Sequence, residues 1–187
     1  LGYVSGCGVG ENKSGSASIV KQGLDRAGGV SITYQVVGEE EPSSADMSDT
    51  IYKLQKRVEN GQAVAEFLEK HPKVAYVNYS GLPSNKYYER AQKYLPNGGC
   101  GVVSFGLKGG RKAASTFMQN LRLGAIETHV ADARTCCLNP ATSTHRQMTD
   151  EQLVEAGVPA ELIRISLGLE DKEDLIADIS NALDAIQ

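Results

Sequence analysis

The chain has 187 residues, a net charge of −4 and 41% hydrophobic residues, which is enough for one domain with a hydrophobic core. The acidic balance provides no general affinity for nucleic acid, and no apolar run approaches the ~20 residues of a membrane span. The N-terminus has no basic segment followed by an apolar run, so we expect no signal peptide.

The cysteines and histidines give no sign of a metal site. The four cysteines include no C-x-x-C pair, and the three histidines form no H-E-x-x-H motif. Cys136 and Cys137 are adjacent, and in a strand they would point to opposite faces. We therefore expect reduced thiols in a cytoplasmic protein without a bound metal.

Residues 1–47 form a distinct N-terminal segment that we leave unassigned. It is rich in glycine at its start, and residues 8–14 invite comparison with a phosphate-binding loop, but Asn12 stands where that loop needs glycine before the Lys-Ser pair. Residues 18–27 are predicted as a short helix, 30–37 as a strand, and the acidic, Pro-containing residues 38–46 as a linker.

Residues 48–187 are predicted as the second domain. Ser48 or Asp49 can cap a helix over 50–70, whose apolar residues recur at helical spacing. Strands are predicted over 73–79 and 100–107, with helices over 85–94 and 111–121. Short extended pieces follow at 125–130 and 135–138, then a loop over 139–146. Thr149 and Gln152 form a capping box for a small helix, and the chain ends with a strand around Arg164 and a helix over 170–186. This alternation gives an α+β or α/β fold, a sheet with helices on one face.

The strand around Arg164 separates apolar from polar side chains. Ile163, Ile165 and Leu167 fall at period two and face one side, while Arg164 and Ser166 face the other. One arginine therefore stands on the polar face of an otherwise apolar strand. Its fork of donors suits a carboxylate or a phosphate.

Four blocks of the chain resemble one enzyme family. The blocks are residues 64–74, 77–82, 139–145 and 162–171, in the family's order and spacing. The resemblance is to the C-terminal domain of the trans-sulfuration family, the pyridoxal-phosphate (PLP) enzymes of cysteine and methionine metabolism, and is closest to the O-acetylhomoserine sulfhydrylases of methionine biosynthesis. It implies an α+β fold, the small C-terminal domain of a type I PLP-dependent transferase, with a mainly antiparallel sheet and helices on one face.

The resemblance also implies roles for particular residues. Arg164 matches the family's arginine that grips the α-carboxylate of the substrate. Thr142 and Ser143 could donate hydrogen bonds near the substrate, and His129 lies in the segment that lines its carboxylate. The family commonly has Ser or Asn at the place of His129, Gly at that of Ala131, and His at that of Asn139.

Two neighbouring features keep structural interpretations. His145 could shuttle a proton, but a histidine that fixes the loop is the favoured interpretation. Asp132 and Arg134 are interpreted as a solvated pair.

The lysine that the family needs is missing. The Schiff-base lysine of the family lies in a Ser-x-Thr-Lys-Tyr setting, which no lysine here has; Lys13 comes nearest and does not match. We therefore expect no catalytic residue in this chain and no PLP bound by it alone.

Two classes of function remain open. One is the substrate-carboxylate half of a sulfhydrylase, acting on an O-acetylhomoserine-like amino acid. The other is a non-catalytic or separated module that binds an amino acid or a partner, or a domain of a cystathionine lyase or synthase. Because a domain without its large partner exposes apolar surface, we expect a homo-oligomer or a companion PLP domain, with no nucleic acid or membrane as partner.

Overall fold

The computed structural model describes residues 43–187, so the helix predicted over 18–27 and the strand predicted over 30–37 lie outside the described residues. The elements are α3 (Ser44–Lys70), β1 (Val74–Asn78), α4 (Tyr88–Tyr94), β2 (Val102–Leu107), α5 (Gly110–Asn120), β3 (Ala125–Ile126), β4 (Cys136–Leu138), the 3-10 turn η1 (Pro140–Thr142), α6 (Asp150–Glu155), β5 (Leu162–Ser166) and α7 (Lys172–Asp184).

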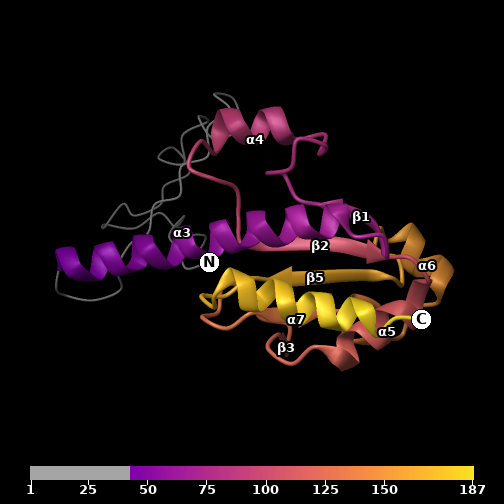
Figure 1. The fold of residues 1–187 in the computed structure, drawn as a ribbon. Helices are drawn as coiled ribbons and strands as arrows, with labels where there is room; N and C mark the ends of the chain where they lie inside the picture. Colours follow the sequence, from indigo (N-terminus) through magenta and orange to yellow (C-terminus); the bar gives the residue numbers. More distant parts are fainter. Residues whose placement is uncertain (1–42) are drawn as a thin grey trace, which may run out of the picture.

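A single five-stranded sheet with the order β1-β2-β5-β4-β3 organises these elements. All neighbouring strands run antiparallel except β3 and β4, which are parallel. The strand β5 therefore lies at the centre, between β2 and β4, and Figure 1 shows it beside β2. The predicted α+β fold with a mainly antiparallel sheet is confirmed.

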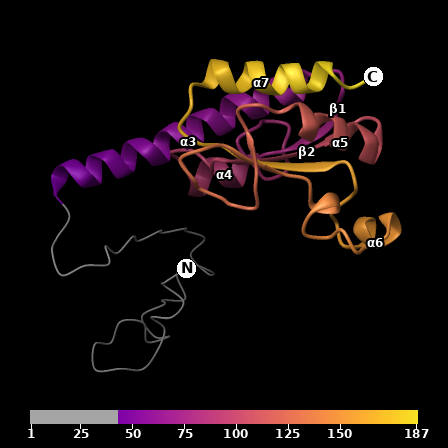
Figure 2. The same cartoon turned by 90° about the horizontal axis from the view of Figure 1, so that it is seen from below.

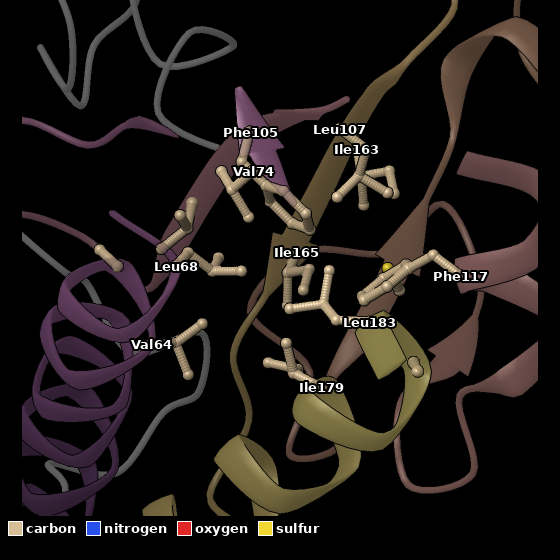
Figure 3. Packing of buried hydrophobic residues seen from close by; sticks show 14 of the residues in the cluster. Val64, Leu68, Val74, Phe105, Leu107, Phe117, Ile163, Ile165, Ile179 and Leu183 are labelled. Atoms are coloured by element: carbon tan, nitrogen blue, oxygen red, sulfur yellow. The ribbon is translucent and has the colours of Figure 1, made fainter. Parts of the chain in front are cut away.

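The hydrophobic core lies between one face of the sheet and the helices α3, α5 and α7. Val64 and Leu68 of α3, Phe117 of α5, and Ile179 and Leu183 of α7 are at most 2% exposed. Their side chains gather around the central strands (Figure 3). In Figure 2 the helix α7 lies on one side of the sheet and the small helix α6 on the other. We call the side away from α3, α5 and α7 the open face.

The alternation predicted for β5 is confirmed. Ile163, Ile165 and Leu167 are at most 1% exposed and belong to the core, so the intervening Arg164 lies on the open face. The pairing places Arg164 between Ser104 of β2 and Leu138 of β4. The core therefore fixes the side of the sheet on which the arginine lies.

The helix α3 begins earlier than the sequence indicated. The predicted caps were Ser48 or Asp49, but Ser43 is the N-cap: its hydroxyl accepts the amide of Asp46, and the Asp46 carboxylate accepts the Ser43 amide. This capping box satisfies amides that the first turn leaves unpaired. The prediction of a linker up to residue 46 was therefore wrong for its last residues. The first turns of α3 extend beyond the sheet (Figure 1).

The strand β3 is shorter than predicted. It ends at Ile126, and the chain then leaves the sheet as an irregular segment over residues 127–135 instead of continuing as a strand to residue 130. Ala131 in this segment has φ of 59°, in the left-handed region, which is incompatible with a strand. We call residues 127–135, up to the start of β4, the crossing loop.

The end of α7 is fixed by one lysine. The ammonium group of Lys73, just before β1, donates to the carbonyl oxygens of Leu183, Asp184 and Ile186 at 2.7–3.2 Å. The last carbonyls of a helix lack intrahelical partners and carry partial negative charge, which a cation offsets. Among residues 43–187, no helix is both long and apolar enough to span a membrane.

Candidate functional site

Arg164 is held from one side only. One terminal nitrogen of its guanidinium group, Nη2, donates to the carbonyl oxygen of Thr128 at 2.8 Å and to that of His129 at 3.4 Å. Its Nε atom is buried and has no hydrogen-bond partner. An unpaired buried donor costs about 1–3 kcal/mol, more when it is charged. The arginine is therefore anchored through one nitrogen and keeps a buried donor for an acceptor.

The crossing loop lies over Arg164 and Ser166. The Ala131 amide donates to the Ser166 hydroxyl at 3.0 Å, and the carbonyls of residues 128 and 129 accept from Arg164. Both polar side chains of the open face of β5 are therefore used to bind the loop. Because the core fixes which side chains of β5 face the open side, it also determines where the loop is bound.

His129 contributes its backbone rather than its ring to the arginine contact. The imidazole is 66% exposed, with Nδ1 3.2 Å from a carboxylate oxygen of Glu127 and 4.0 Å from one of Asp132. The carbonyl of His129 accepts from Arg164. The ring thus lies beside two carboxylates at the surface of the crossing loop.

Asn139 supports the turn that contains Thr142 and Ser143. Its amide nitrogen donates to the carbonyls of Ala160 and Leu162, and its side-chain oxygen accepts the Thr142 amide. With only 2% of its surface exposed, Asn139 has both halves of its amide satisfied, as a buried amide requires.

Thr142 and Ser143 are bound within their own turn. Both hydroxyls donate to the carbonyl oxygen of Asn139, at 3.2 Å from Thr142 and 2.6 Å from Ser143. A hydroxyl has one proton to donate, so in this arrangement both can only accept a further hydrogen bond. The turn directly follows Leu138, the β4 partner of Arg164.

The neighbouring polar residues have local partners. The Nδ1 atom of His145 lies 2.8 Å from the Thr144 hydroxyl, and its backbone amide donates to the carbonyl of Pro140, an arrangement that fixes the loop. The carboxylate of Asp132 accepts the backbone amide of Arg134. Among residues 43–187, no group of three or more His, Cys, Asp or Glu side chains is placed to hold a metal ion.

A second set of contacts near the site was not found by sequence reasoning. Asn60 of α3 is fully buried and binds the turn after β5, while Glu170 in that turn binds Thr135 at the end of the crossing loop. The sequence interpretation gave Glu170 a place near the start of the last helix. The one available signal was a polar residue, Asn60, on the apolar side of a helix.

Comparison with known proteins identifies the family. The family model described as Cys/Met metabolism PLP-dependent enzyme matches residues 50–184. The chain belongs to this family. A homocysteine synthase of Schizosaccharomyces pombe is 43% identical over 132 residues, covering 71% of this chain and 31% of the relative. An O-acetyl-L-homoserine sulfhydrylase of Thermus thermophilus is also 43% identical, over 70% of this chain and 31% of that protein.

Other relatives carry a different reaction name. An L-methionine gamma-lyase of Porphyromonas gingivalis is 38% identical over 76% of this chain and 36% of that protein. A crystal structure described as an O-acetylhomoserine (thiol)-lyase of Campylobacter jejuni, with a pyridoxyl-modified lysine, matches with a TM-score of 0.68 and 33% identity, covering 75% of this chain and 33% of that one. The chain thus spans about a third of the length of these relatives.

The strands of the described sheet carry no lysine that would hold PLP beside Arg164. PLP enzymes hold the cofactor through a lysine amine, and none of the five strands carries a lysine. The amine of Lys73 binds three carbonyls at the end of α7, and that of Lys108 binds the carbonyl of Pro72. Within residues 43–187, no strand therefore offers an amine beside Arg164 for the cofactor.

The left-handed conformation of Ala131 gives a test of the loop geometry. Glycine adopts positive φ without the steric cost that a Cβ atom imposes, so Ala131→Gly is expected to raise the free energy of unfolding by about 0.5–1 kcal/mol. The measurement is urea denaturation followed by circular dichroism. The matched control is Ala133→Gly in the same loop, which is expected to lower stability because it only adds freedom to the unfolded chain. Equal losses for both variants would contradict the described loop.

Proposed function

We propose that residues 48–187 form the substrate-carboxylate half of an O-acetylhomoserine sulfhydrylase, and that PLP is held by a domain outside these residues. In that reaction sulfide or a thiol replaces the acetate of the amino acid. The family and the sulfhydrylase relatives support this assignment, as does the share of relatives' length that the chain spans. Residues 1–47 stay unassigned.

The observation that carries the proposal is the buried, unpaired Nε of Arg164. The contact of Nη2 with the crossing loop fixes the plane of the guanidinium group. A carboxylate can then accept from the Nε donor that the loop leaves free, and this charge-assisted hydrogen bond would hold it beside the positive charge. Each charge-assisted hydrogen bond contributes about 1.5–3 kcal/mol.

Thr142, Ser143 and His129 would complete this site. We propose that the Thr142 and Ser143 hydroxyls accept a hydrogen bond from the substrate's amino group, because their own protons go to Asn139. His129 would act through its carbonyl, which orients Arg164. The role of this chain is thus binding and orientation of the amino acid, and chemistry on the bound substrate falls to PLP held elsewhere.

The first turns of α3 expose apolar side chains, which supports a contact with a partner. Met47, Ile51 and Leu54 are 44%, 49% and 37% exposed and recur at helical spacing. Apolar side chains aligned on a protruding helix favour contact with another surface. We propose a companion PLP domain or a second copy of the chain as that partner.

The three cysteines of the described residues are free thiols, which supports the cytoplasm as the compartment.

The second candidate is a module that binds an amino acid without catalysis. It is favoured by the absence of lysine from the strands of the described sheet. A domain of a lyase in the same family is a related candidate, since the L-methionine gamma-lyase of Porphyromonas gingivalis is 38% identical over the matched segment. A carboxylate-binding Arg164 would serve each of these functions.

Variants of Arg164 test its proposed role in binding the substrate carboxylate. Arg164→Met is expected to weaken binding of O-acetylhomoserine to the 187-residue chain at least about tenfold, and Arg164→Lys to weaken it less, because lysine keeps the charge but loses the fork. Isothermal titration calorimetry measures both affinities. The control variant is Arg122→Met, which alters an exposed arginine outside the site. Equal affinity in wild type and Arg164→Met would overturn the proposed role.

A cofactor titration separates the two candidates from a self-sufficient enzyme. We expect the full chain mixed with PLP to show no stable internal-aldimine band at about 400–430 nm, and borohydride followed by peptide mapping to trap no single lysine. Any weak label spread over surface lysines should vanish when free lysine is added as a competitor. One lysine labelled in a 1:1 ratio, whether in residues 1–42 or later, would show that the chain holds PLP by itself.

A further inference from the structure

Asn60 occupies a position where an apolar side chain would be expected. It lies on the buried side of α3, is 0% exposed, and its side-chain oxygen has no hydrogen-bond partner. Burying an unpaired polar atom is unfavourable, so this residue needs a compensating contact. Its amide nitrogen supplies one, because it donates to the carbonyl oxygens of Gly168 at 3.1 Å and Glu170 at 2.9 Å.

Residues 168–170, which Asn60 binds, also bind the end of the crossing loop. The carboxylate of Glu170 accepts the Thr135 amide at 2.6 Å and the Thr135 hydroxyl at 2.8 Å. The same hydroxyl accepts the Gly168 amide at 2.8 Å, and the Leu169 amide donates to the carbonyl of Ala133. Four hydrogen bonds therefore join residues 168–170 to residues 133–135.

Gly168 allows this close approach. A Cβ atom at this position would lie 2.4 Å from the carbonyl oxygen of Ala133 and equally close to a carboxylate oxygen of Glu170. No side chain fits between the turn and the loop at that distance. The loop thus lies directly against the turn, and a displacement of the turn would be transmitted to it.

The opposite part of the crossing loop binds Arg164. Its carbonyls at residues 128 and 129 accept from Nη2, and a second residue of α3, Arg57, donates from its Nε to the carbonyl of Asp132 at 3.1 Å. The loop has no helix or strand of its own over residues 127–135, so these outside contacts determine its position.

We propose that Asn60 is a positioning residue: by holding the 168–170 turn, it fixes the crossing loop whose carbonyls orient the guanidinium group of Arg164. The consequence for amino-acid affinity rests on the proposed function. The hold on the loop does not, and it is measured separately. Asn60 would act only through the turn and the loop.

The experiment is amide hydrogen exchange by NMR on the full chain with Asn60→Leu, a substitution of similar size without the amide. The amides of Ala131 and Thr135 are expected to exchange at least about tenfold faster, since local opening becomes easier when its hydrogen bonds are lost. Amides of the β2–β5 ladder should change much less. The O-acetylhomoserine affinity is expected to fall several-fold although Arg164 is unchanged.

Two further variants complete the experiment, one as a control for lost stability and one as a replacement for Asn60→Leu. Lys73→Met is the destabilised control: it removes the contacts at the end of α7, so it should lower global stability but leave the Ala131 and Thr135 amides and the affinity unchanged. If Asn60→Leu does not fold, Thr135→Val serves instead, because it removes the hydroxyl that links Gly168 to Glu170 and keeps the branched shape. It should loosen the same amides.

The outcomes separate the two proposals. Exchange at Ala131 and Thr135 that stays unchanged, or that rises only in proportion to the β-ladder amides, overturns the positioning role of Asn60. Selective loosening of the loop with undiminished affinity also overturns it, because the loop would then not matter to the site. If the wild-type chain binds no amino acid while the loop still loosens, the proposed function fails and the hold of Asn60 on the loop stands.

Discussion

The two-residue period of β5 is the constraint on which the rest of the site depends. Ile163, Ile165 and Leu167 must face the helices because they complete the core, so Arg164 and Ser166 must face the other way. A shift of one residue in the pairing would bury the arginine and expose the isoleucines. The burial of these apolar side chains therefore determines the face of the sheet on which the guanidinium group lies.

The site is built from parts that are distant in sequence. The crossing loop is attached to β5 through Arg164 and Ser166, to the turn after β5 through Thr135 and Glu170, and to α3 through Arg57. Each of these attachments includes a hydrogen bond to a backbone group of the loop. A loop without regular structure is fixed here by side chains that reach its carbonyls and amides, a way of satisfying backbone groups outside helices and strands.

Much of the fold could be predicted from local patterns. The period of β5 and the capping box of Thr149 and Gln152 are confirmed, because each depends on neighbouring residues. The local patterns left α+β and α/β open, and the resemblance to the family selected the α+β class that the sheet confirms. The predicted start of α3 was wrong because the Ser43–Asp46 capping box follows a proline and an acidic run, which are typical of a linker. The extended piece at 125–130 was predicted too long, because β3 ends at Ile126 and no residue over 127–130 marks that end in the sequence.

The site was predicted in part only. The place of Arg164 on the open face follows from its strand, but the partners of its guanidinium group lie 35 and 36 residues earlier in the chain. The contacts of Asn60 span more than a hundred residues, and no local pattern encodes a contact of that range. Thr142 and Ser143 were predicted as donors, whereas their protons are committed to Asn139, a detail that only the turn geometry reveals.

The measurement that tests the central claim most directly is the NMR signal of the Arg164 Nε–H group in the full chain, assigned by its loss in Arg164→Lys. Added O-acetylhomoserine is expected to shift this signal in a saturable way, because the carboxylate becomes the acceptor that Nε lacks. The methyl ester of the same amino acid is expected to leave the signal unchanged. An Nε–H signal that responds to neither compound, or equally to both, would contradict the assignment of Arg164 to the substrate carboxylate.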